Sequence, residues 1–221
     1  MLFTIYTKDF GKVEVLGKAI RKVSSKLRSG AELFYFSEVE FIQGKTHKTL
    51  TDAILIEKFA NIRKDLRKLS VAFKISEVLN SLVRGQEPDE KIWKLLVSVT
   101  LKLNSVKNIE EVKHKIYYYF FWNLISLMGY EPDFYKCYVC GKRISQKSIY
   151  FNAREGGLVC ENCQKSKKAL REIDPDTIKV LRLALKKDWK TLAKVKLSED
   201  NLKSITSTSD YYLKRMLEHI E

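Results

Sequence analysis

The sequence predicts an α+β protein, in which a small antiparallel β-barrel or curled sheet is followed by an all-helical domain with an inserted four-cysteine zinc ribbon. Three observations support this class. Strand-forming residues fill the first 57 positions, apolar residues recur with a helical period from about residue 61, and all four cysteines lie within residues 137–163. We therefore expect a β domain at 1–60 and a helical domain at 61–221, with the ribbon at 134–166.

The N-terminal region contains short segments in which β-branched and aromatic residues predominate. Turn-forming residues separate them at Asp9-Phe10-Gly11-Lys12 and at Gln43-Gly44-Lys45. We expect strands at residues 2–7, 13–19, 33–41 and 49–57. Strands of this length without helical periodicity favour a small antiparallel barrel or a curled sheet.

Helix signals begin at Asn61, which is a suitable N-cap for a helix that ends near Gly85. A second helix is expected to begin at Pro88-Asp89-Glu90. Proline fits the first helical position, and acidic side chains favour the positive end of the helix dipole.

A third helix is expected from Ile109 to Gly129, and it contains the aromatic run Tyr117-Tyr118-Tyr119-Phe120-Phe121-Trp122. A run this apolar should pack on two sides instead of facing solvent. The alternative is a platform on which nucleic-acid bases stack, but most aromatic side chains are packing residues. Further helices are expected from Pro175 and from Asp200 to Ile220.

The cysteines form two close pairs with the overall spacing C-x2-C-x19-C-x2-C. A two-residue gap lets both thiolates of a pair bind one ion, and two such pairs complete a tetrahedral site. Gly141 suits the turn after the first pair, and residues 149–159 read as strand, Gly-Gly turn and strand. We predict one zinc ion held by Cys137, Cys140, Cys160 and Cys163. It should be structural, because no coordination position is left for water.

The ribbon is also basic. From Lys136 to Arg171 there are nine basic residues and two acids. This charge would let the ribbon touch phosphate, but zinc ribbons also serve only to hold a fold together, and charge alone does not choose between the two uses.

The whole chain has the same bias, with 41 Lys and Arg against 27 acids and a net charge of +14. Such an excess implies a polyanionic partner, either nucleic acid or an anionic membrane surface, unless the charge serves solubility alone. No segment approaches the roughly 18 apolar residues of a spanning helix, and the N-terminus lacks a signal-peptide pattern. We expect a cytoplasmic protein without a membrane role, in which paired cysteines indicate metal and not disulfides.

Catalytic motifs are incomplete. Gly44-Lys45-Thr46 has the end of a phosphate-binding loop, but Val39 stands where the leading glycine belongs. The three histidines lie far apart in the sequence. Asp174-Pro175-Asp176 could hold magnesium, but it is better explained as a helix start in which Asp174 is the cap. We therefore predict a binding protein and not an enzyme.

A basic segment connects the second and third expected strands. Lys18, Arg21, Lys22, Lys26 and Arg28 fall within eleven residues that contain no acid, with serines among them. These cations can release counterions from DNA, and the serines can donate to phosphate oxygens. No base-reading pattern accompanies them, so binding should be largely independent of sequence. The alternative is a solvated basic loop without a partner.

Several segments, in order over nearly the whole chain, resemble the RecO family. They are Tyr6-Thr7-Lys8-Asp9-Phe10-Gly11-Lys12, Gly17-Lys18-Ala19-Ile20-Arg21-Lys22, Ser25-Lys26-Leu27-Arg28, Phe134 to Cys140, Phe151 to Cys160, and Tyr211 to Leu217. Together these matches are specific, although no single one would be.

The resemblance implies an OB-fold-like barrel (an oligonucleotide-binding fold) followed by a helical domain that carries the zinc ribbon. In this family a further short segment precedes the stretch that opens this chain, and it supplies the first strand of the barrel. Either the true start of the protein lies upstream of this stretch, or the barrel here lacks that strand and leaves an unpaired edge open to association. By motif, the resemblance assigns DNA contacts to Lys18, Arg21, Lys22, Lys26 and Arg28.

The resemblance further implies a recombination mediator in DNA repair. Such a protein binds single- and double-stranded DNA, anneals complementary strands, and works with RecR to load RecA onto DNA covered by single-strand-binding protein (SSB). The tail of SSB is expected in a groove of the helical domain, and the location is the cytoplasm, at the nucleoid. Two other classes stay open. One is a zinc-ribbon adaptor that binds RNA or protein without annealing, and the other is a degenerate nuclease, which would need a larger carboxylate cluster.

Overall fold

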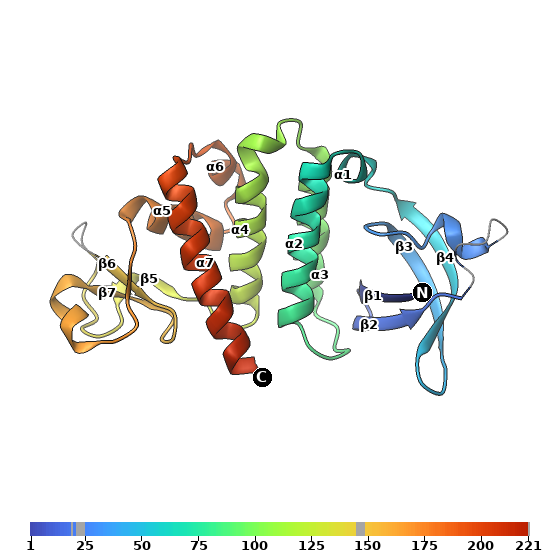
Figure 1. Ribbon diagram of the computed structural model, residues 1–221, viewed down its shortest axis with the longest axis horizontal. Coiled ribbons are helices and arrows are strands. Elements are labelled where there is room, and N and C mark those ends of the chain that lie inside the picture. The colour runs from blue at the N-terminus through green and yellow to red at the C-terminus, as the bar shows by residue number, and fades with distance from the viewer. Residues whose placement is uncertain (19, 21–24, 145–148, 221) are drawn as a thin grey trace. The chain divides into compact units, whose positions relative to one another are not determined.

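The structure, a computed structural model, describes residues 1–18, 20, 25–144 and 149–220 (Figure 1). For residues 26, 28, 110–112, 219 and 220 it describes the backbone only. The chain forms two compact units, residues 1–113 and 114–221, and each is described by itself. An N-terminal sheet followed by a mainly helical region confirms the predicted α+β class.

The first unit opens with a four-stranded sheet in the order β1-β2-β4-β3. Its strands are β1 (Leu2–Thr7), β2 (Gly11–Leu16), β3 (Phe36–Gln43) and β4 (Lys48–Glu57). Two antiparallel hairpins, β1–β2 and β3–β4, meet through a short parallel pairing of β2 with β4 at Val15–Lys48 and Leu16–Thr49. The expectation of a purely antiparallel arrangement was therefore wrong at this junction.

The third strand begins later than expected, at Phe36 instead of residue 33. Phe34 has a positive φ of 60°, which an extended strand does not allow. The cause is a turn at residues 32–35, where the N–H of Tyr35 donates to the carbonyl of Glu32 at 3.2 Å. The backbone thus leaves the η1 helix (Lys26–Ser29) and turns before it enters β3.

Three helices complete the first unit: α1 (Ala60–Lys64), α2 (Leu66–Leu82) and α3 (Glu90–Ser105). The prediction of one helix capped by Asn61 was wrong, because the helix is interrupted at Asp65 and a second helix, α2, begins after it. The Asp65 carboxylate accepts from the N–H of Arg67 at 2.9 Å and caps α2, while Asn61 lies inside α1. Asp89 caps α3 in the same way, close to the predicted start.

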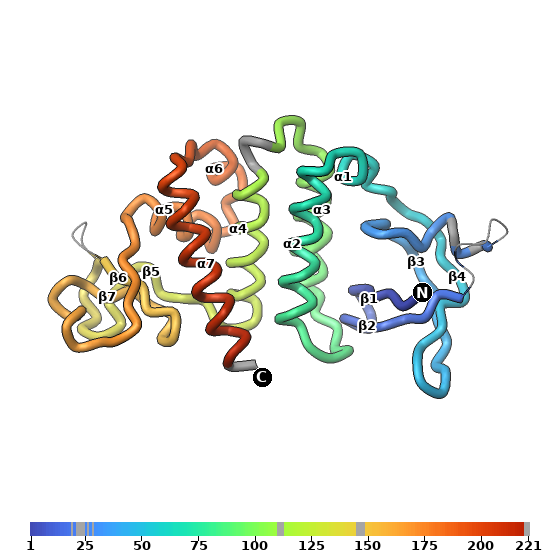
Figure 2. The backbone as a smooth tube through the Cα atoms, in the orientation of Figure 1, coloured from blue at the N-terminus to red at the C-terminus, as the bar shows by residue number. Residues whose placement is uncertain are grey.

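The second unit is organised around α4 (Ile109–Leu127), whose first residues, 109–113, belong to the first unit. Its aromatic run is buried from Tyr118 to Trp122, with Phe120, Phe121 and Trp122 at 0% exposure, while Tyr117 is half-buried. Trp122 stacks on Tyr212 of α7 (Glu199–Ile220) at 5.4 Å between ring centroids and contacts Phe134 edge-on at 5.5 Å. Figure 2 shows α4 and α7 side by side. Packing on two sides, and not a surface platform for bases, is confirmed.

Two shorter helices, α5 (Pro175–Leu185) and α6 (Trp189–Lys194), lie between the ribbon and α7 in the chain. The helix start at Asp174-Pro175 is confirmed, since the Asp174 carboxylate accepts from the N–H of Thr177 at 2.7 Å. Helix α6 was not predicted. It has only six residues, fewer than two full turns, so its periodicity is too short to detect.

A second four-stranded sheet, in the order β5-β7-β6-β8, makes up the ribbon. Its elements are β5 (Asp133–Cys137), β6 (Ile149–Asn152), β7 (Gly157–Cys160), the η2 helix (Glu161–Ser166) and β8 (Arg171–Glu172). The predicted strand–turn–strand at 149–159 is the antiparallel pair β6–β7. Within the described residues, no helix is both long enough and apolar enough to cross a membrane.

Candidate functional site

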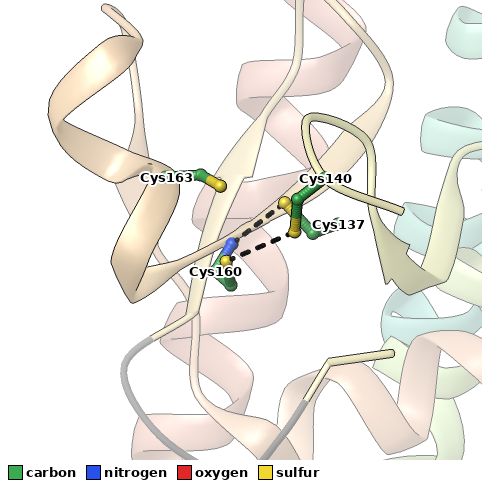
Figure 3. A group of neighbouring side chains, drawn as sticks. All are labelled: Cys137, Cys140, Cys160 and Cys163. Carbon is green, nitrogen blue, oxygen red and sulfur yellow. Dashed lines mark hydrogen bonds between the residues drawn. The ribbon is translucent and has the colours of Figure 1, made fainter. Parts of the chain in front are cut away.

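The four cysteines converge at one end of the ribbon (Figure 3). Cys137 ends β5 and Cys140 follows in the loop, while Cys160 ends β7 and Cys163 lies in η2. All four sulfur atoms lie within 4.8 Å of one another, and all four residues are free cysteines. Among the described residues this is the one cluster of Cys, His, Asp or Glu side chains close enough to hold a metal ion.

Local backbone contacts explain how the first pair is shaped. The N–H of Gly141 donates to the carbonyl of Cys137 at 2.8 Å, and the N–H of Cys137 donates to the carbonyl of Lys142 at 2.9 Å. Gly141 has a φ of +70°, which favours glycine after such a turn. The second pair is placed by the β6–β7 hairpin, where Cys160 lies opposite Ile149.

The thiols differ in how easily they ionise. Burial acts to raise the pKa of Cys137, but the N–H groups of Cys160, Cys140 and Val139 hydrogen-bond to its sulfur and lower the pKa to about 6. Hydrogen bonding to the Cys160 side chain, and then burial, raise the pKa of Cys163 to about 12. Four thiolates side by side repel one another, so the cluster suits a cation that neutralises them together.

The spacing fits zinc. Zinc–thiolate bonds of about 2.3 Å in a tetrahedron place the sulfur atoms roughly 3.8 Å apart. The sulfur atoms of Cys140 and Cys160 lie 3.9 Å apart, and the N–H of Cys160 points at the sulfur of Cys137 from 3.5 Å. Such N–H contacts orient a thiolate ligand and stabilise its charge. The chain therefore offers a possible four-sulfur metal site.

The predicted DNA contacts lie on the connection from β2 to η1. The Lys18 side chain is exposed. Arg21 and Lys22 lie outside the described residues, and Lys26 and Arg28 belong to η1 with their side chains outside the description. The structure therefore leaves the five-residue set as a prediction.

The ends of this connection are fixed to the sheet. Ile20 and Leu27 are both 7% exposed and join the core that Val13, Val15 and Leu50 form. Gly30 follows η1 so closely against β4 that a Cβ atom there would overlap the carbonyl of Ala53. Ile20, Leu27 and Gly30 are therefore fixed to the face of the sheet that forms its core.

Sequence reasoning missed a set of cation–aromatic contacts on the second unit. Lys167 lies over Tyr138, Arg171 over Tyr211 and Arg182 over Tyr135, with distances to the ring centroids of 5.4, 4.3 and 4.5 Å. The basic excess from Lys136 to Arg171 was the available signal. It did not identify the tyrosines, because two of the three pairs join residues far apart in the sequence.

Comparison with known proteins gives a consistent result. The family model described as "Recombination protein O C terminal" matches residues 63–221. The chain is 30% identical over its full length to the DNA repair protein RecO of Desulforamulus reducens, of which it covers 86%. It is 29% identical over 97% of its length to the protein of the same name from a Thermoanaerobacter strain, covering 85% of it. The corresponding Dehalococcoides mccartyi protein is 28% identical over 92% of this chain, which covers 79% of it.

Proposed function

The chain belongs to the RecO family of DNA repair proteins, and from that premise we propose that it is a recombination mediator that binds DNA and anneals complementary single strands. The observation that supports annealing most directly is the net charge of +14. Two DNA strands repel each other, and a surface rich in lysine and arginine lowers that repulsion while it holds both strands. Annealing of this kind needs no covalent chemistry, so the proposal includes no catalytic residue.

DNA binding is assigned to residues 1–60 as an OB-fold-like domain, with Lys18, Arg21, Lys22, Lys26 and Arg28 as the contacts. The strand order β1-β2-β4-β3 supports this assignment. A fifth strand placed between the outer strands β1 and β3 would close the sheet into the five-stranded barrel of an OB-fold. The burial of Ile20 and Leu27 in the sheet core supports the proposal, since these residues lie within the stretch from Lys18 to Arg28.

One zinc ion is proposed for Cys137, Cys140, Cys160 and Cys163. With four thiolate ligands the ion has no open position for water or substrate, so its contribution is to hold the ribbon together. The helical domain, residues 61–221 with the ribbon at 134–166, is then the scaffold that this ion completes.

The protein partners follow from family membership. We propose that the protein takes up the SSB tail in a groove of its helical domain, and that with RecR it helps to load RecA onto SSB-coated DNA. Single- and double-stranded DNA are both ligands, and the site of action is the cytoplasm at the nucleoid.

The test is an annealing assay with complementary labelled single strands, each coated with SSB, in the absence of ATP. The protein should accelerate pairing, and a gel should show that the strands stay intact. Arg21→Glu/Lys22→Glu should slow pairing on all sequences alike, because the contacts are to phosphate. Lys190→Glu/Lys194→Glu, which reverses two exposed lysines of the second unit, is the matched control and should pair strands at nearly the wild-type rate.

Absence of acceleration, with DNA binding retained, would contradict the annealing role. Tighter binding to structured RNA than to single-stranded DNA would instead favour the zinc-ribbon adaptor. Metal-dependent shortening of the strands on the gel would favour the nuclease.

A further inference from the structure

The segment Lys165–Arg171 connects the zinc site to β8, and we call it the strap. It carries Lys165, Lys167, Lys168 and Arg171, and all four residues are exposed. In the part of the chain that the structure describes, none of the four forms an ion pair. The strap therefore concentrates uncompensated positive charge on one short stretch of backbone.

The backbone of the strap is fixed from two sides. The side-chain amide of Asn152, a buried residue of β6, donates to the carbonyl of Lys168 at 3.5 Å. The hydroxyl of Tyr211 in α7 donates to the carbonyl of Ala169 at 2.8 Å. Between these two contacts Ala169 adopts a φ of 57°, a conformation that L residues rarely adopt without support from their surroundings.

Two of the cations are also held in place. The Lys167 ammonium lies 5.4 Å from the centroid of the Tyr138 ring, whose hydroxyl accepts from Asn152 at 3.3 Å. The Arg171 guanidinium lies 4.3 Å from the centroid of Tyr211 and donates to the Ser207 hydroxyl at 3.0 Å. The same Nη1 also donates to the Ser207 carbonyl at 3.5 Å. A guanidinium has five N–H donors, so its other nitrogens still have donors for a ligand.

Stacking on tyrosine restricts where these charges can lie, and it leaves them on the surface. Cations that are already ordered lose less conformational entropy when they bind an anion. A strained backbone residue, fixed carbonyls and exposed, oriented cations together indicate a binding surface for a polyanion and not a solvated linker.

We propose that the strap binds the phosphodiester backbone of single-stranded nucleic acid, as a second contact surface in addition to the N-terminal basic segment. The inference rests on the proposed function, since it presumes a nucleic-acid ligand. It adds that the second compact unit contributes its own phosphate contacts, through Lys165, Lys167, Lys168 and Arg171.

The experiment measures binding of a fluorescent oligo(dT) by the full chain over a range of salt concentrations. The strap variant is Lys165→Gln/Lys167→Gln/Lys168→Gln. For single strands each phosphate contact contributes a slope of about −0.7 in log affinity against log salt, so losing three contacts should reduce the steepness by roughly 2. The same loss is expected with oligo(U), because both ligands share the phosphodiester backbone.

A matched control, Lys190→Gln/Lys194→Gln/Lys196→Gln, removes three exposed lysines of the same unit and should keep the wild-type slope. Replacing the three strap lysines by arginine should keep it as well. The double variant Lys165→Gln/Lys168→Gln leaves the Lys167–Tyr138 contact in place, so it tests the charge without that structural change and should lower the steepness by about 1.4. Zinc content and melting temperature report whether each variant is folded.

An unchanged slope in the strap variants, or an equal loss in the control, would overturn the strap as a binding site. If Arg21→Glu/Lys22→Glu weakens binding in the same experiment, the proposed function survives that outcome. A wild-type protein that binds neither oligonucleotide would overturn both the strap and the proposed function.

Discussion

The two β-sheets of the protein have similar strand arrangements but are stabilised differently. Each sheet has four strands. In each, one short parallel pairing joins an antiparallel hairpin to the rest of the sheet: β2 pairs with β4 in the first sheet, and β5 pairs with β7 in the second. Those pairings bring together Val15 with Lys48 in the first sheet and Cys137 with Leu158 in the second. In both sheets, a contact between residues distant in the sequence has to be stabilised against the entropy of closing the intervening loop.

The N-terminal sheet stabilises this contact by burying apolar side chains, chiefly Val13, Val15 and Leu50, with Ile20 and Leu27 from the basic segment. The ribbon also buries apolar side chains, among them Phe134, Phe151 and Leu158, and in addition it brings four sulfur atoms to one point. Apolar burial spreads stabilisation over many small contributions, whereas a metal site concentrates it in one. The two sheets should therefore respond very differently to a single substitution.

The largest effect is expected from Cys160→Ser, which removes one of the four proposed zinc ligands. Zinc contributes on the order of 10–16 kcal/mol to the folding of zinc-finger peptides, so loss of the ion should unfold the ribbon. Zinc content by mass spectrometry should fall well below one ion per chain. Amide hydrogen exchange should rise in β5, β6 and β7.

The same exchange experiment contains its own control, because β1 to β4 should stay protected. Ser166→Ala is a matched variant beside the site. It removes only the hydroxyl that donates to the carbonyl of Cys163 and should keep the ion. Full zinc content in Cys160→Ser, or equal loss of protection in both sheets, would contradict the division between metal and apolar closure.

A smaller effect is expected from Gly30→Ala in the N-terminal sheet. The added methyl group would overlap the carbonyl of Ala53, and overpacking of this kind costs about 1–3 kcal/mol. Urea denaturation should show the lower free energy of unfolding, while zinc content should stay at the wild-type value. Because Gly30 anchors the end of the basic segment, affinity for single-stranded DNA should fall as well.

Thr51→Ala is the control for this change, since Thr51 lies on β4 with an exposed side chain. It should alter neither stability nor DNA affinity by much. If Gly30→Ala is as stable as wild type, then the close approach of η1 to β4 does not hold the segment in place.

The comparison of the sheets also explains what the sequence could predict. The cysteine spacing led directly to the sulfur cluster, because two cysteines separated by two residues can bind one ion together. The helix start at Asp174 was equally readable, because cap, proline and acidic first turn are all local signals. The apolar period likewise located α3, α4 and α7 to within a few residues.

The features that the sequence did not predict have one of two physical causes. Either two residues compete for the same structural role, or the contact joins residues far apart in the sequence. Asn61 and Asp65 are both good N-cap residues, and only the packed structure shows that the long helix begins at Asp65. The parallel pairing of β2 with β4 has no sequence signature, since period-2 patterns do not encode strand order. The basic charge of the strap was visible in the sequence, but the contacts of Tyr211 with Ala169 and Arg171 were not, because Tyr211 lies far along the chain from both.

The smallest of these effects tests a local signal in the second unit, the cap that precedes α5. Asp174→Ala removes the acceptor for the N–H of Thr177 and should lower the free energy of unfolding by about 0.5–2 kcal/mol.

Burial acts to raise the pKa of Asp174, but hydrogen bonds from the Thr177 hydroxyl and N–H lower it below its ordinary value. A carboxylate with a depressed pKa in the folded state stabilises the protein above pH about 4, and that contribution disappears as the pH falls through the folded pKa. The difference between wild type and Asp174→Ala should therefore be largest near neutral pH and shrink in acid. Asp176→Ala is the matched control, because Asp176 is exposed and only pairs with Lys179, so its loss should cost a few tenths of a kcal/mol. Equal losses in the two variants, or a difference that does not change with pH, would show that Asp174 is not the cap that fixes where α5 leaves the ribbon.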